Sequence, residues 1–167
     1  MAAGSLALVG FGLDSFVEVF AGSVVLWHLA GVDERRQRRA LRLIGVSFFA
    51  LAAYVMVEAV RDLVSGAEAG ESTVGLALAV VSLVVMPALA WAKRRTGQAL
   101  ADPVIVADST ETLLCSYLSV ILLVGLALNA SLGWWWADPL AGLGIAALAV
   151  REGVEAWRGE TGEDDRD

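Results

Sequence analysis

Two pairs of side chains with metal-ligand chemistry occur at the same spacing in this chain of 167 residues. Asp14 and Glu18 form the first pair, and Glu111 and Cys115 form the second. Residues four apart lie on one face of a helix, so each pair would present its two side chains next to each other. Carboxylate oxygens and a thiolate sulfur bind divalent transition metals, and four such ligands suit a tetrahedral site. These four residues are therefore candidate metal ligands.

The elements that must position these pairs are long apolar segments, in a chain of which 57% of residues are hydrophobic. The hydrocarbon core of a bilayer takes about 20 residues of helix. Five segments meet this requirement, at roughly residues 5–30, 42–64, 73–92, 104–128 and 138–157. We therefore predict an all-α, polytopic membrane helix bundle with five transmembrane helices in residues 1–158. The acidic residues 159–167 would form a short cytoplasmic tail.

The distribution of charge between the spans predicts their orientation. Residues 33–42 and 93–97, which we place in connections, are rich in Arg and Lys, whereas residues 65–71 and 129–133 contain none. Basic connections remain on the cytoplasmic side of a membrane. The sequence thus predicts an N-terminus outside and a C-terminus in the cytoplasm, in the plasma (inner) membrane of a bacterium.

The composition also excludes several classes of function. One Cys is too few for a disulfide framework, and one His is too few for a histidine-rich metal site. A net charge of −7 leaves no basic surface for nucleic acid. An enzyme is not expected, because Cys115 has no histidine within reach of a membrane-embedded thiol.

The acids in the middle of the spans need a counter-charge or a proton. A charged side chain at the bilayer centre costs about 2.5 kcal/mol or more, and we place no Lys or Arg at that depth. The acids could be protonated and hydrogen-bonded between helices, or a divalent cation could balance them. Two matched pairs at matched depth favour the cation. Because metal binding releases the protons of its ligands, such a site would suit metal/proton exchange.

Other residues within the spans have more ordinary interpretations. Asp108 is either a relay on the cytoplasmic side or a residue at a helix start. Glu58 is followed by Arg61 and is expected to pair with it. His28 is expected to pack near the cytoplasmic end of the first span, and Pro87 is expected to bend the third.

A set of segments occurs in a fixed order along the chain, at residues 4–8, 14–18, 54–61, 107–111, 137–143 and 151–153. This ordered set resembles the cation diffusion facilitator family of divalent metal efflux proteins. Residues 4–8 and the pair that follows them are similar to that family's second transmembrane helix. The remaining similarities are to its third helix at residues 54–61, to the start of its fifth at 107–111, and to its sixth at 137–143 and 151–153. The resemblance covers nearly the whole chain. The family's first helix and its C-terminal cytoplasmic domain have no counterpart among these motifs.

This resemblance implies a function and a set of site residues. By position, Asp14, Glu18, Glu111 and Cys115 match the four transport-site ligands of the family. Acids stand where the family often has His, and Cys115 stands where it usually has Asp, which implies a divergent subgroup. Members of the family are homodimeric exporters, usually driven by proton antiport. Without the cytoplasmic domain, a homodimer would form through the transmembrane helices.

The expected function is transport of a divalent cation, by alternating access, with protons moving in the opposite direction. A thiolate among carboxylates favours Zn²⁺, while Mn²⁺, Fe²⁺, Co²⁺ and Cd²⁺ are alternatives. A second hypothesis is a membrane metal-binding or accessory protein that partners a full-length transporter and transports nothing itself. Metal binding without flux would favour this second hypothesis.

Overall fold

The computed structural model describes residues 3–31, 33–66 and 73–159, with side chains from Ser15 onward except at 73–76, 126 and 130. These residues form five helices and, within the described part of the chain, no strand. The helices are α1 (Ala3–Leu29), α2 (Glu34–Ser65), α3 (Thr73–Leu100), α4 (Pro103–Leu132) and α5 (Ala137–Arg158). The prediction of an all-helical bundle is confirmed.

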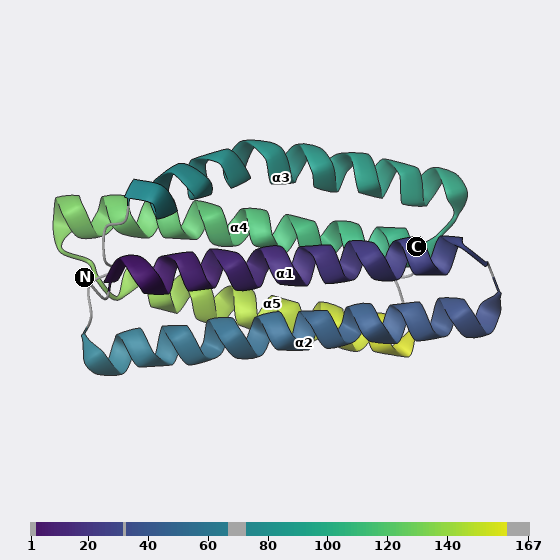
Figure 1. Ribbon diagram of the computed structural model, residues 1–167. Coiled ribbons are helices and arrows are strands. Elements are labelled where there is room, and N and C mark those ends of the chain that lie inside the picture. Colours follow the sequence, from purple (N-terminus) through teal and green to yellow (C-terminus); the bar gives the residue numbers. More distant parts are fainter. Residues whose placement is uncertain (1–2, 32, 67–72, 160–167) are drawn as a thin grey trace, which may run out of the picture.

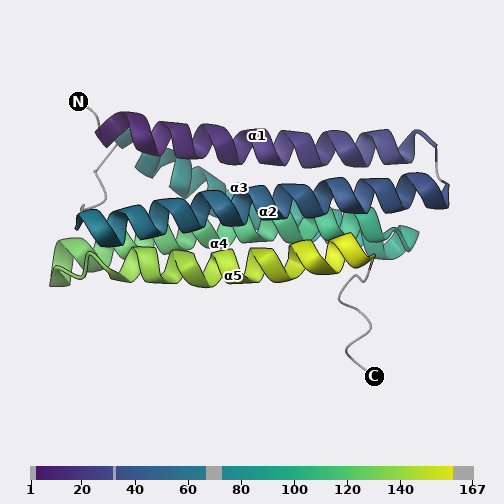
Figure 2. The ribbon, with the colours of Figure 1, turned by 90° about the horizontal axis from the view of Figure 1, so that it is seen from below.

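The five helices lie lengthwise beside one another, and consecutive helices run in opposite directions (Figures 1 and 2). The most extensive packing joins α2 to α5 and α3 to α4, whereas α1 makes smaller contacts with α2, α3 and α4. Pro87 lies inside α3, which arches along its length in Figure 1. A proline inside a helix removes one main-chain hydrogen bond and favours such curvature.

Within the described ranges, three segments are long and apolar enough to cross a membrane: Glu34–Ser65, Ala77–Leu100 and Pro103–Asn129. A shorter apolar segment, Ser15–Leu29, lies in α1. The outside of the bundle carries large apolar side chains, such as Leu26 (72% exposed) and Val84 (70% exposed). Exposed apolar surface of this extent is unusual for a soluble monomer and suits contact with lipid.

The helices extend beyond the predicted spans, which corrects our placement of the basic residues in connections. Residues 33–42 fall largely within α2, where Asp33 is the N-cap and accepts a hydrogen bond from the Arg36 amide at 2.7 Å. Residues 93–97 lie inside α3, which continues to Leu100. Arg, Lys and Gln favour helix, so a helix need not end where its apolar segment ends. Because successive helices are antiparallel, both basic segments lie at the same end of the bundle.

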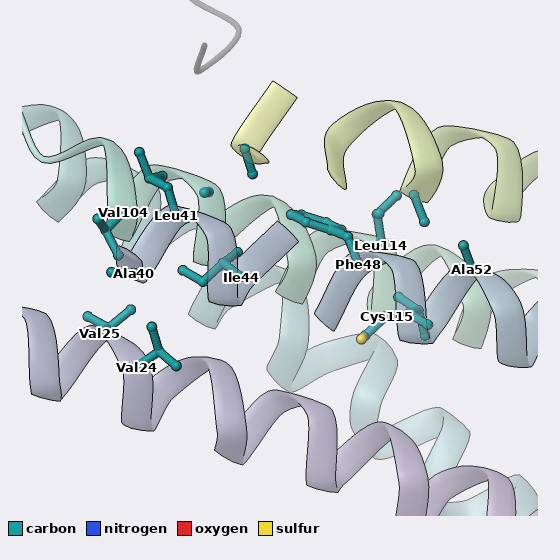
Figure 3. Close-up of a cluster of buried hydrophobic side chains, with 14 of the residues drawn as sticks. Val24, Val25, Ala40, Leu41, Ile44, Phe48, Ala52, Val104, Leu114 and Cys115 are labelled. Atoms are coloured by element: carbon teal, nitrogen blue, oxygen red, sulfur yellow. The ribbon is translucent and has the colours of Figure 1, made fainter. Parts of the chain in front are cut away.

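Apolar side chains of α1, α2, α4 and α5 form the core, part of which Figure 3 shows. Phe48 of α2 is 1% exposed and Val24 of α1 is 6% exposed. Glycine allows α2 and α5 to approach closely, because a Cβ atom on Gly153 would lie 2.9 Å from Cε1 of Phe49. Close packing at small residues is typical of helices in membranes. It accompanies the most extensive packing in the bundle, which joins α2 to α5.

Candidate metal site

A cluster of polar side chains joins α1, α3 and α4 inside the bundle. The ammonium group of Lys93 donates hydrogen bonds to Glu18 Oε1 at 2.8 Å and to Thr112 Oγ1 at 2.9 Å. Its Nζ also lies 2.9 Å from Asp108 Oδ2, and the Asp108 side chain is 2% exposed. A lysine ammonium has three N–H donors, so Lys93 uses all of them within this cluster.

This cluster contradicts the expectation that no basic side chain accompanies the acids. We placed Lys93 after the third span, but α3 continues through it. Only Ala101 and Asp102 connect α3 to α4. The chain therefore reverses direction within two residues, and Lys93 and Asp108, at similar distances from the reversal, come together. The signal in the sequence was the single lysine of the chain, positioned to meet an aspartate across a tight connection.

Among the described side chains, Glu111 is one of the polar groups most fully removed from solvent. It is 0% exposed, and neither of its carboxyl oxygens has a hydrogen-bond partner among the described residues. The nearby hydroxyl of Ser47 donates instead to the Ile44 carbonyl, at 2.7 Å. Glu18 and Asp108 lie close enough for their charges to act on Glu111. A buried carboxyl group without partners is costly, and a bound cation would supply the missing interaction.

Cys115 follows Glu111 by one helical turn and is 2% exposed. Figure 3 shows its side chain in the apolar core with Phe48 of α2 and Leu114 of α4. Glu111 and Cys115 are thus both buried, and the face of α4 that carries them points toward the inside of the bundle.

The structure describes three of the four expected ligands. Glu18, Glu111 and Cys115 have described side chains, whereas the side chain of Asp14 lies outside the described part of the structure. Among the side chains from Ser15 onward that are described, no three His, Cys, Asp or Glu residues form a group that could hold a metal ion. The four-ligand site therefore stays a prediction.

The remaining polar residues have structural partners. Asp108 is not at a helix start, because α4 begins earlier and Asp102 caps it by accepting hydrogen bonds from two main-chain amides. His28 is buried and its Nε2 lies 3.0 Å from Asp102 Oδ2, so it links the end of α1 to the start of α4. Glu58 and Arg61 form the expected ion pair, with 3.7 Å between Oε1 and Nη1.

Comparison with known proteins tests the resemblance seen in the sequence. A family model described as the cation efflux transmembrane domain matches residues 43–158, which is well over half of the chain. The chain belongs to the cation efflux family. This membership confirms the resemblance to the cation diffusion facilitators, and with the apolar helices it identifies an integral membrane protein.

Relatives within the cation efflux family align with almost all of the chain. An uncharacterized transporter of Synechocystis is 28% identical over 93% of the chain and 54% of the relative. The magnetosome protein MamB of Magnetospira is 24% identical over 91% and 55%. The cation-efflux pump FieF of Shewanella oneidensis is 26% identical over 91% and 55%. The chain thus spans about half the length of these relatives.

Proposed function

We propose that this protein carries a divalent metal cation across the membrane. The observation that carries the proposal is Glu111, fully buried in a cation efflux domain with no described partner for either carboxyl oxygen. Ionisable residues within membrane segments mark ion pathways by default. Relatives named as a transporter and as a cation-efflux pump support the same function.

In this proposal, Asp14, Glu18, Glu111 and Cys115 bind the transported ion. Glu111 and Cys115 are one helical turn apart on α4, and Asp14 and Glu18 on α1 would complete the set. Zn²⁺ is the preferred ion because a thiolate favours softer metals, and Mn²⁺, Fe²⁺, Co²⁺ and Cd²⁺ are alternatives.

Protons are the proposed counter-ions. Carboxylates and a thiol must lose their protons to bind a metal, so entry of the ion releases protons and its exit allows them to return. Alternating access would then connect this exchange with the two sides of the membrane. No chemical step on a substrate is required, so the protein acts as a transporter rather than as an enzyme.

The proposed orientation places the basic end of the bundle in the cytoplasm. Residues 33–42 and 93–97 lie at this end, and α5 ends there as well (Figure 1). By the positive-inside rule, the N-terminus would face outward and the C-terminus the cytoplasm of a bacterial cell. Two copies would associate through their transmembrane helices.

Reconstitution into proteoliposomes tests this function. Zinc is added outside vesicles that contain a pH-sensitive dye, and the native chain is compared with the Asp14→Asn and Glu111→Gln variants. Zinc entry should move protons outward in the native chain and not in either variant. Glu58→Gln is the control, because it removes a carboxylate that pairs with Arg61 away from the proposed ligands.

One outcome would count against transport, and another against the assigned ligands. If proton movement in the native chain equals that of empty vesicles while zinc still binds, the chain is a metal-binding or accessory protein. If Glu111→Gln transports zinc as fast as the native chain does, Glu111 is not a ligand.

A further inference from the structure

Lys93 connects three helices through one ammonium group. Its partners are Glu18 on α1 and Asp108 and Thr112 on α4, all at 2.8–2.9 Å. The Lys93 side chain is 18% exposed, so the charge is largely removed from solvent. A partly buried cation that uses every donor is held in one position.

Each carboxylate gives Lys93 only one of its two oxygens. Glu18 Oε1 accepts from Lys93 and also lies 2.7 Å from the Thr112 hydroxyl, whose single proton it can accept. Glu18 Oε2 and Asp108 Oδ1 are buried and have no hydrogen-bond partner among the described residues. The contact therefore fixes the orientation of the Glu18 carboxylate and leaves Oε2 available.

We propose that Lys93 is a positioning residue for cation binding, which holds Glu18 through Oε1 so that Oε2 faces the transported ion. The inference rests on the proposed function and adds a residue to it. Lys93 does not touch the ion. It acts through Glu18, as hydrogen-bonded partners of metal ligands do in other metal sites.

The geometry favours positioning over competition. If the Lys93 ammonium simply took the place of the metal, it would form hydrogen bonds with the same ligand oxygens that the metal binds. Lys93 instead shares Oε1 with Thr112 and leaves Oε2 and both oxygens of Glu111 without described partners. Lys93 also places one positive charge between the carboxylates of Glu18 and Asp108, which lowers the electrostatic repulsion between them whether or not a metal ion is bound.

Zinc affinity of the full-length chain in detergent, measured by isothermal titration calorimetry, tests this role. Lys93→Met should raise the dissociation constant for zinc by about 10–100-fold, the usual effect of removing a partner of a metal ligand. Thr112→Val retains the shape of the side chain and every charge but removes the second donor to Glu18 Oε1. It should weaken binding in the same direction by a smaller factor.

Arg95→Met is the matched control for charge. Arg95 lies two residues from Lys93, is exposed, and stacks on Trp91 with 5.3 Å between Cζ and the ring centroid. The substitution removes one positive charge from the same end of α3 without touching Glu18, so zinc affinity should match that of the native chain.

The outcomes separate this inference from the proposed function. If Lys93→Met binds zinc as tightly as the native chain or more tightly, Lys93 is structural or a competitor, and the inference is overturned while the function stands. If Lys93→Met does not fold, Thr112→Val decides, and an unchanged affinity overturns the inference. A native chain that binds no zinc, or one whose affinity is unaffected by Glu111→Gln, would instead overturn the proposed function.

Discussion

Replacing Glu111 by leucine should make the cation-free protein more stable. The side chain is 0% exposed and both carboxyl oxygens lack partners among the described residues, so the folded state retains a polar group that has lost its water. Leucine has a similar size and no polar atoms. A residue kept for function at the expense of stability should behave in this way when it is removed.

The size of the effect follows from the burial. Leaving a buried polar group unsatisfied costs about 1–3 kcal/mol. For a chain of this length, each kcal/mol corresponds to about 2–4 °C in melting temperature. Glu111→Leu should therefore raise the melting temperature of the metal-free protein by about 2–12 °C.

Thermal unfolding in detergent, followed by helical circular dichroism with and without zinc, measures this effect. At zinc concentrations of 100 times its dissociation constant, the native chain should gain about 2.7 kcal/mol. The Glu111→Leu variant should gain almost nothing. The variant should therefore be the more stable chain without zinc, whereas the native chain should show the larger stabilisation when zinc is added.

A second variant in the same helix controls for the loss of any buried polar group. Ser119 is 6% exposed, but its hydroxyl already donates to the Cys115 carbonyl at 3.1 Å. Ser119→Ala should change the melting temperature little and preserve the response to zinc. If Glu111→Leu melts below the native chain without metal, Glu111 has a structural partner and the reasoning fails.

Two further predictions concern the helix contacts, and thermal unfolding measures both. His28→Ala should lower the free energy of unfolding by about 1.5–3 kcal/mol, the usual value for a hydrogen bond to a charged group, because it removes the contact with Asp102. An unchanged melting temperature would show that this contact does not hold α1 against α4. Gly153→Ala should cost about 1–3 kcal/mol, because its Cβ would meet Phe49 at 2.9 Å. Gly144→Ala, where an added Cβ would meet no packed neighbour within 4 Å, should cost nothing, and equal losses at both glycines would contradict close packing as the cause.

The five helices could be predicted from long apolar stretches, although among the described residues only α2, α3 and α4 contain one long enough to cross a bilayer. Their ends could not be predicted from that criterion. The length of an apolar run is set by the thickness of the bilayer, whereas a helix begins and ends where its main-chain groups are capped. Asp102, for example, caps the start of α4. Gly66 and Gly133, both with positive φ, mark two of the C-terminal ends.

The pairing of Lys93 could not be predicted from the spacing of residues along single helices. Its hydrogen bond to Glu18 joins residues 75 positions apart. The contact depends on how α1 and α3 are rotated about their own axes. Helices that are apolar on most of their surface contain little information about that rotation, because no polar face identifies the outside. The pairing of His28 with Asp102, 74 positions apart, was hidden for the same reason.

The way the helices pack suggests how movement of the helices would change the proposed metal site. α2 packs most extensively on α5 and α3 on α4, while α1 makes smaller contacts with its neighbours. Glu111 lies on α4 near Ser47 of α2, and Glu18 lies on α1. The proposed ligands therefore lie on α1 and on α4, and α4 packs less extensively on α1 than on α3. A small displacement of α1 against α4 would change the distance between ligands while leaving each helix pair packed. Alternating access by rocking of packed helix groups requires a binding site at such a junction.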